Sequence, residues 1–194
     1  MDTDELGMVL RILMSTDGTV THIVEAYAGE PVYLVKLFHS FVTDPTDRAK
    51  VGLEADERGL RRKILLRGEE SHATFVYADS VVMLDRLPPG VADGLLDSEL
   101  PIGKLLYGCR AETFREIIAM WEERDDQIAA LFDVDPGEVL VSRTYEIVMH
   151  GRPFARITEK FPRSAFAGPP PSAARRRPRP PHIHAGPQGP DPSL

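Results

Sequence analysis

The chain contains little sulfur and no long apolar segment. Cys109 is the only cysteine among 194 residues, so no disulfide can form within the chain and a reducing compartment is expected. No apolar run approaches the roughly 20 residues that span a bilayer. The acidic start, MDTDELGM, lacks the basic region and apolar run of a signal peptide. We therefore expect a cytoplasmic protein that does not associate with membranes.

Familiar chemical motifs are also scarce. The sequence has no phosphate-binding loop, no G-x-S-x-G elbow, no dinucleotide fingerprint and no cysteine cluster. His182 and His184 form an H-x-H pair, but it lies in a segment rich in Pro and Arg, where we do not expect a metal site. The acids of DVDPGE, from Asp133 to Glu138, lack the spacing of a calcium loop. These motifs therefore predict no metal site.

Composition and charge divide the chain in two. From residue 167 onward it is dense in Pro and Arg and has little to bury, which predicts one folded domain over 1–166 and a disordered tail over 167–194. Four arginines and one aspartate give the tail a charge of +3; because the whole chain carries −7, the domain carries −10. Such an acidic domain is a poor candidate for binding nucleic acid or an anionic membrane. Any anion site in it must be built from a few local cations.

The hydrophobic pattern predicts helices and many consecutive strands. Helical spacing and capping residues indicate two helices, within 4–18 and 19–29. Strands are expected over 31–42, 60–68 and 73–84, and as a hairpin over 139–149 and 154–161. Residues 44–59 read as a polar connection, 88–106 as short helices or turns, and 124–138 as a helix closed by a turn. Residues 109–121 fit either a strand or a helix. The order favours an α+β domain on an antiparallel sheet flanked by helices.

Three charged residues fall among apolar residues in the predicted strands. Successive side chains of a strand point to opposite faces. One charged residue in each of three predicted strands shares a face with the apolar residues. These residues are Glu159 in FARITEKF, Arg62 in LRRKILLRG and Arg143 in VLVSRTYEIVM. The other face of LRRKILLRG carries three cations beside Leu65, and we expect that face to meet water. The pattern thus predicts two inward arginines and one inward glutamate.

Such buried charges need a partner or a ligand, because a lone buried charge is too costly to persist. In one interpretation, Arg62 or Arg143 pairs with Glu159 as a structural salt bridge, which typically costs ~3–5 kcal/mol to break. In the other, the arginines and Glu159 line a pocket: an arginine fork binds a carboxylate, and the carboxylate faces a hydroxyl or a moving proton. A one-residue register error would reverse the faces, so the pattern leaves both interpretations open.

Several segments occur in an order that resembles a known family. They are the inward arginine on RRKILLRG, then DSVVMLDRLP, LPIGKLL and the closing GRPFARITEKF, with LRILMSTDGTVTHIVEA near the start and AETFREI in the middle. This order, over roughly residues 10–166, resembles the chorismate pyruvate-lyase family, especially its branch that makes 4-hydroxybenzoate outside ubiquinone synthesis. The resemblance implies an antiparallel sheet flanked by helices, with a small internal site for the aromatic product.

The resemblance also implies roles for particular residues. Arg62 matches the arginine that binds the ring carboxylate, and Glu159 matches the glutamate of the TE-x-F element that faces the ring hydroxyl; these two are the implied catalytic residues. The implied substrate-binding residues are Val20, Ile102, Gly103 and Arg143. Val20 covers the ring where ubiquinone-pathway enzymes have a longer Met, and a backbone amide of Ile102 or Gly103 contributes a contact. Arg143 matches a basic position of the family on the preceding strand, and as a candidate site residue it ranks below Arg62.

The activity so implied is a lyase reaction of secondary metabolism. Chorismate, a small dianion, would be converted to 4-hydroxybenzoate and pyruvate without a metal or an organic cofactor. Two alternatives stay open: an enzyme of the same fold that acts on another small metabolite, and a non-catalytic effector-binding domain. The effector domains of one family of transcription regulators resemble this fold, but they normally follow a DNA-binding domain of some 60–70 residues. Here the resemblance begins almost at residue 10, so we expect this alternative least. The sequence predicts no oligomeric state.

Overall fold

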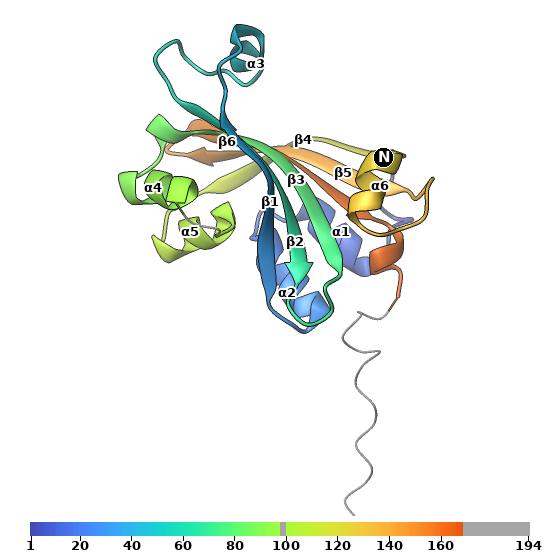
Figure 1. Cartoon of the computed structure of the whole chain (residues 1–194). Coiled ribbons are helices and arrows are strands. Elements are labelled where there is room, and N and C mark those ends of the chain that lie inside the picture. Colours follow the sequence, from blue (N-terminus) through green and yellow to red (C-terminus); the bar gives the residue numbers. More distant parts are fainter. Residues whose placement is uncertain (98–99, 169–194) are drawn as a thin grey trace, which may run out of the picture.

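A computed structural model describes residues 1–97 and 100–168, and its centre is a six-stranded antiparallel sheet (Figure 1). The strands are β1 (Val32–Phe41), β2 (Gly59–Gly68), β3 (Thr74–Met83), β4 (Phe114–Glu123), β5 (Leu140–Met149) and β6 (Arg152–Pro162). Their order in the sheet is β1-β2-β3-β6-β5-β4, so two three-stranded meanders meet where β3 pairs with β6. Residues 169–194, nearly all of the predicted tail, lie outside the described residues.

The helices of the described residues are short, with six to nine residues each. They are α1 (Met8–Ser15), α2 (Val20–Ala28), α3 (Pro45–Lys50), α4 (Pro89–Asp97), α5 (Ile102–Gly108) and α6 (Asp126–Leu131), with 3-10 turns η1 (Leu84–Arg86) and η2 (Ser164–Phe166). The helix α2 ends where Gly29 adopts a left-handed φ of 70°, a conformation that glycine adopts readily at the end of a helix. Within the described residues, no helix combines the length and the hydropathy needed to cross a membrane.

The prediction for residues 44–59 needs correction, and the open choice for residues 109–121 is now decided. The polar connection 44–59 contains the helix α3, because the side chain of Asp44 accepts hydrogen bonds from the backbone amides of Thr46 and Asp47 and Pro45 suits the first helical position. The ambiguous segment 109–121 contains most of the strand β4, which pairs with β5 at the edge of the sheet. Its mixed periodicity reflects an edge strand that is half exposed along its length.

One face of the sheet carries most of the core. The helices α1 and α2 pack over one half of this face, and α4 and α5 pack over the other half. The three predicted inward charges all lie on it and are buried: the exposed fractions are 3% for Arg62, 0% for Arg143 and 6% for Glu159. The prediction of three inward charges is therefore confirmed.

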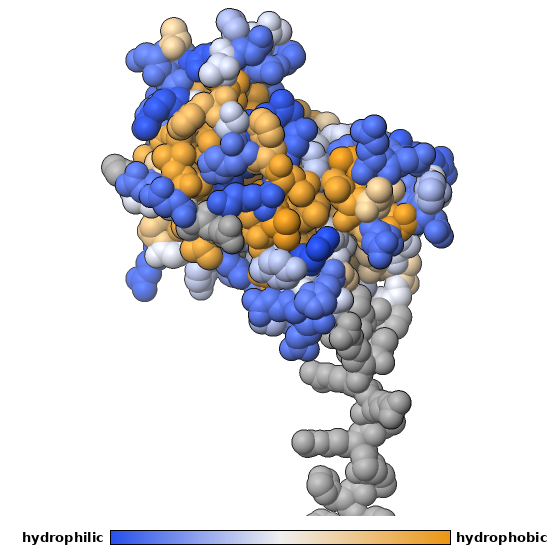
Figure 2. Space-filling model, viewed as in Figure 1, coloured by the Kyte–Doolittle hydropathy of each residue, from blue (hydrophilic) through white to orange (hydrophobic). Residues whose placement is uncertain are grey.

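The opposite face of the sheet is less covered. Leu65 is buried there with Tyr77, Phe132 and Leu140 beneath α6, so the expectation that this side of β2 simply meets water was wrong at that position. The edge strand β1 exposes Leu37, Phe38 and Phe41. Figure 2 shows hydrophobic residues gathered in the middle of this side of the molecule, between hydrophilic residues above and to the right. The β1 edge is therefore a poorly protected part of the sheet.

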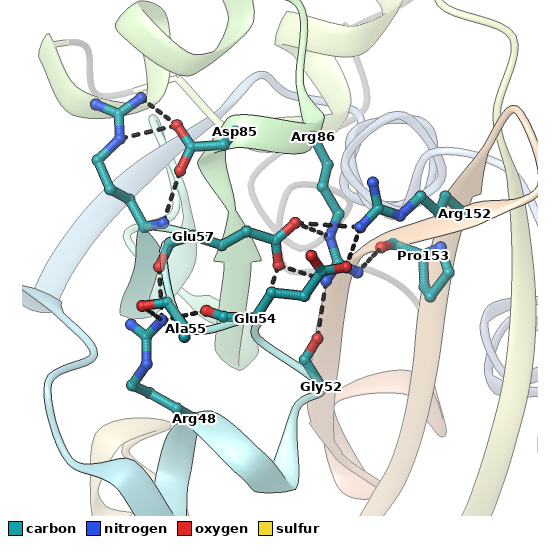
Figure 3. Close-up of polar contacts among 10 residues, drawn as sticks. Arg48, Gly52, Glu54, Ala55, Glu57, Asp85, Arg86, Arg152 and Pro153 are labelled. Carbon is teal, nitrogen blue, oxygen red and sulfur yellow. Dashed lines mark hydrogen bonds and ion pairs between the residues drawn. The ribbon is translucent and has the colours of Figure 1, made fainter.

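A buried ionic network fixes the loop that follows α3 (Figure 3). Arg86 donates through Nε and Nη2 to the carboxylate of Glu57, at 2.7 and 2.5 Å, and through Nη1 and Nη2 to the carbonyls of Pro153 and Gly52, at 2.7 and 2.8 Å. Arg152 adds a second cation at Glu57. We call these groups the Arg86 network. It joins the loop 51–58, η1 and the start of β6, so it holds the end of the sheet from which α4 begins.

Candidate active site

A small cavity lies between the helix-covered face of the sheet and the N-terminal ends of α2 and α5. Its volume is about 60 Å³. Residues from all six strands, β1 to β6, form its floor, and the segments 19–21 and 101–103 form its cover. Five of the six residues singled out in the sequence line it: Val20, Arg62, Ile102, Gly103 and Glu159. The structure therefore brings together residues that are as much as 139 positions apart in the chain.

A larger hollow of about 890 Å³ lies on the opposite face of the sheet, but it is a weaker candidate. Each of its cationic side chains has an ion-pair partner: Lys50 with Asp47, Arg61 and Lys63 with Asp79, Arg156 with Glu146, and Lys160 with Glu123. Paired surface charges of this kind are common and carry no specific chemistry. The smaller cavity differs because its charges are buried and incompletely paired.

Glu159 is held in place by two neighbours on β5. Its Oε2 accepts a hydrogen bond from Nε of Arg143 at 3.0 Å, and its Oε1 accepts one from the hydroxyl of Tyr145 at 2.9 Å. Arg143 is the cross-strand partner of Glu159, so β-sheet register sets this contact. Burial, and then the charge of Glu159, raises the pKa of the Tyr145 phenol, so Tyr145 keeps its proton and stays a donor. Glu159 is thus oriented while it lines the cavity.

Arg143 lies behind Glu159 and is not among the residues that line the cavity. Its side chain is fully buried, its Nη1 donates to the carbonyl of Thr16 at 3.0 Å, and its guanidinium lies 4.8 Å from the centre of the Tyr145 ring. Of the two arginines expected to pair with Glu159, Arg143 therefore does so and Arg62 does not. A substrate contact of Arg143 stays a prediction.

Arg62 is a buried cation without a counter-charge in the part of the chain that the structure describes. Its Nε and Nη2 are buried and have no hydrogen-bond partner there, and it forms no ion pair with a described residue. Burial lowers the pKa of its guanidinium, which expresses the cost of keeping this charge out of water. Nε and Nη2 are adjacent donors, and together they match the two oxygens of a carboxylate. The arrangement suits an anionic ligand.

Among the cavity residues that were not singled out in the sequence, Tyr145 and Arg115 carry ionisable side chains. Tyr145 falls on the inward face of VLVSRTYEIVM, so the strand pattern could have included it. Arg115 also lines the cavity, but it lies in the segment that fitted both a strand and a helix, so no face could be assigned to it. The Nε of Arg115 is buried and unpartnered among the described residues, while its Nη1 donates to the carbonyl of Asp17.

The cover of the cavity depends on a close approach between α2 and α5. A Cβ atom on Gly103 would lie 2.7 Å from Cγ2 of Thr19, so glycine permits the start of α5 to contact the start of α2. Ile102 and Gly103 occupy the first turn of α5, where backbone amides have no acceptor within the helix. The predicted amide contact from this segment is therefore compatible with its geometry and stays a prediction.

The charges around the cavity differ in sign from those of the domain. Arg62, Arg115 and Arg143 against Glu159 give a local charge of +2, inside a domain whose residues carry −10. Among residues 1–97 and 100–168, no group of three His, Cys, Asp or Glu side chains is placed to hold a metal ion. The H-x-H pair of the tail lies outside the described residues. The site thus offers cations for a small anion and one carboxylate for a hydroxyl or a proton.

The structure thus defines the class of protein: an antiparallel α+β domain with a small internal cavity lined by buried cations and one carboxylate. Comparison of the sequence with known proteins identifies the family. It matches the family described as chorismate pyruvate-lyase Rv2949c-like over residues 14–167. It is 32% identical over 171 residues to a chorismate pyruvate-lyase of Mycobacterium leprae, with 84% of this chain and 78% of the relative covered. It is 29% identical to a chorismate pyruvate-lyase of Mycobacterium tuberculosis, with 84% and 83% covered. The chain belongs to the Rv2949c-like chorismate pyruvate-lyase family.

Solved structures support the fold. The effector domain of PhnF from Mycobacterium smegmatis superposes with a TM-score of 0.57 and 13% identity, over 76% of this chain and 90% of that one. At this identity the likeness concerns the fold alone. It confirms the predicted α+β architecture and the predicted likeness to effector domains of transcription regulators.

Proposed function

We propose that this protein is a lyase that converts chorismate to 4-hydroxybenzoate and pyruvate. Membership of the family makes a chorismate-like small molecule the expected substrate. The observation that carries the proposal is the unpaired side of Arg62, Nε and Nη2, in the same cavity as the oriented carboxylate of Glu159. The substrate carries a ring carboxylate and, at the opposite ring position, a hydroxyl. The two side chains supply the matching groups.

The spacing of the strands suits this assignment. Arg62 on β2 and Glu159 on β6 are separated by β3, so their backbones lie two strand spacings apart, roughly 10 Å. With both side chains directed to the same face, that span matches the length of one six-membered ring with polar groups at its two ends. The cavity of about 60 Å³ is smaller than such a ring, so binding requires the covering segments 19–21 and 101–103 to move away from the sheet. Arg62 binds the ring carboxylate through its Nε and Nη2, and Glu159 accepts a hydrogen bond from the ring hydroxyl.

The reaction is an elimination that makes the ring aromatic. The ring carbon that bears the hydroxyl loses its hydrogen, that electron pair forms the new ring double bond, and the bond from the neighbouring carbon to the enolpyruvyl oxygen breaks. The bonding pair stays on the departing oxygen, and the resulting enolate takes up one proton at its methylene carbon and becomes pyruvate. Aromatisation supplies much of the driving force, so the protein contributes desolvation, orientation and charge stabilisation. Glu159, fixed by Arg143 and Tyr145, assists the proton transfer from beside the hydroxyl.

The direct test is to incubate the purified protein with chorismate and to follow 4-hydroxybenzoate and pyruvate by chromatography with mass detection. Equimolar appearance of both products above the spontaneous rate, lost in Arg62→Ala, supports the proposal. Absence of turnover together with thermal stabilisation by 4-hydroxybenzoate would identify a binding domain, the function suggested by the PhnF-like fold. Absence of both would assign another small metabolite to the cavity.

A further inference from the structure

We infer that Arg115 binds the second carboxylate of the substrate, the one on the side chain that leaves as pyruvate; this assignment rests on the function proposed above. Of the residues that line the cavity, Arg62 and Arg115 are the cations and Glu159 is the acid. One arginine satisfies one carboxylate. A dianionic substrate that enters this cavity therefore has one cationic residue left for its second charge.

The strand order places Arg115 on the far side of Glu159 from Arg62. Arg62 is on β2, two strands before β6, and Arg115 is on β4, two strands beyond it. When the ring carboxylate lies at Arg62 and the hydroxyl at Glu159, the enolpyruvyl group extends from the ring carbon next to the hydroxyl. It therefore lies at the Glu159 end of the ring, where β5 and β4 supply Tyr145 and Arg115.

The contacts of Arg115 leave it able to bind an anion. Its Nε is buried and has no hydrogen-bond partner among the described residues, and its guanidinium lies 5.8 Å from the centre of the Tyr145 ring. Tyr145 in turn donates to Glu159, so Arg115 lies one side chain away from the proposed acid–base group. A carboxylate bound to Nε of Arg115 would supply the missing acceptor and would place the departing group near Tyr145 and Glu159.

Arg143, the residue expected to neutralise this carboxylate, is less suitable. Its Nε is already occupied by Glu159 and its Nη1 by the carbonyl of Thr16, and it does not line the cavity. Arg143 positions Glu159, whereas Arg115 faces the space that a substrate would fill. Arg115 also has a structural contact, because its Nη1 holds the loop between α1 and α2 through the carbonyl of Asp17.

The two contacts of Arg115 predict different effects, and this separates a binding role from a structural one. Chorismate carries both carboxylates, whereas 4-hydroxybenzoate carries the ring carboxylate alone. A loosened α1–α2 loop would disturb Thr19 and Val20, which cover the ring, and would weaken the binding of both molecules. Loss of the side-chain carboxylate contact would affect chorismate and spare 4-hydroxybenzoate.

The experiment measures kcat/KM for chorismate and, by calorimetry, Kd for 4-hydroxybenzoate in the full-length protein and its variants. We expect Arg115→Gln to lower kcat/KM about 10- to 100-fold, the factor that accompanies loss of one charged hydrogen-bonding contact, with Kd for 4-hydroxybenzoate changed by less than about twofold. Arg115→Lys, which keeps the charge and one donor, should lose less. Arg62→Gln should impair both quantities. Arg163→Gln, which removes a surface arginine paired with Glu122, is the matched control and should change neither.

Each other outcome refutes a specific statement. If the unmodified protein turns chorismate over and Arg115→Gln keeps its kcat/KM, the assignment of Arg115 is wrong and the proposed function stands. If Arg115→Gln loses turnover and product affinity equally, Arg115 is a structural tether and the assignment is again wrong. If the unmodified protein does not turn chorismate over, the proposed function fails, and the assignment fails with it.

Discussion

Two buried ionic clusters in this molecule are built from the same residue types and are satisfied to different degrees. In the Arg86 network, all three nitrogens of the Arg86 guanidinium donate to protein oxygens, and the Arg86 and Glu57 side chains are 8% and 10% exposed. At the cavity, Arg62, Arg115 and Arg143 each keep at least one buried nitrogen that no described residue accepts from. Both clusters are desolvated, but only the first is complete.

The difference separates a structural cluster from a binding site. A fully hydrogen-bonded buried network stabilises the contacts between the segments it joins, whereas every unpaired donor costs free energy in the folded state. Arg62 and Arg115 line the cavity, so a ligand there can supply the acceptors that they lack, and the protein accepts lower stability in its absence. Substitutions in the two clusters should therefore act on different quantities.

The largest expected effect comes from Arg62→Met, which removes the arginine whose Nε and Nη2 have no partner among the described residues. Turnover of chorismate should fall about 1000-fold, because the ring carboxylate loses its cation in a dry site. The melting temperature of the empty protein should stay unchanged or rise, because an unpaired buried charge is removed. Arg61→Met is the control: it alters the neighbouring arginine, which faces the other side and pairs with Asp79. Retention of most activity in Arg62→Met would refute the role of Arg62.

Arg86→Met breaks the complete cluster and should have the opposite profile. Removing Arg86 takes away the buried ion-pair partner of Glu57, which keeps only the longer contact with Arg152 and the amide of Glu54, and it leaves two carbonyls without this donor. The free energy of unfolding should therefore fall by about 3 kcal/mol. The value of kcat/KM at a temperature where the variant is folded should stay close to that of the parent. Urea denaturation and initial-rate assays measure the two quantities. A stable variant with impaired kinetics would contradict the distinction between the clusters.

Glu159→Gln tests whether Glu159 assists proton transfer or only binds the ring. Glutamine keeps hydrogen-bonding capacity toward Arg143 and Tyr145 but cannot take a proton, so kcat should fall about 100-fold while the affinity for 4-hydroxybenzoate changes much less. Glu146→Gln is a matched control, since Glu146 forms a cross-strand pair with Arg156 on the opposite face. Equal losses of rate and affinity in Glu159→Gln would mean that Glu159 binds the ring without assisting proton transfer.

The last prediction concerns pH and the Arg86 network. The hydrogen bonds from Arg86 lower the pKa of Glu57 from 4.5 to about 2 in the folded protein. A carboxyl with a depressed folded pKa contributes stability that is fully present above its unfolded value and is lost as the pH falls toward its folded value. The stability difference between the parent and Glu57→Gln should therefore be constant above about pH 5 and shrink between pH 4.5 and 2. A difference that does not vary over that range, in urea titrations, would contradict this.

Much of the site was visible in the sequence because strands alternate. Glu159, Arg62 and Arg143 were recognised as inward because each broke an apolar series, and burial confirms all three. Their pairing was not predictable, because the β5–β6 hairpin has a register shift between Ile147 and Val148 that places Arg143 opposite Glu159. Extending the pairing of Met149 with Arg152 without that bulge would have placed Arg143 opposite Thr158, which faces the other side.

The remaining misses have local causes. Arg115 was overlooked because β4 is an edge strand, and a strand that is half exposed along its length shows no clear alternation. The helix α3 was overlooked because six mostly polar residues held by an Asp44 cap leave no hydrophobic periodicity to detect. The burial of Leu65 depends on α6, which is distant in the sequence and reaches the opposite face of β2 only in the folded chain.

The domain is negatively charged, whereas the surroundings of its cavity are positively charged. This difference affects the rate at which an anionic substrate associates with the protein. A dianion approaching a domain of charge −10 is repelled at distances beyond the reach of Arg62 and Arg115, and is attracted only once it enters the cavity. Added salt screens the long-range repulsion more than it screens contacts inside a desolvated site. Moderate ionic strength should therefore speed the association of an anionic substrate with this protein, whereas salt slows association between partners of opposite net charge.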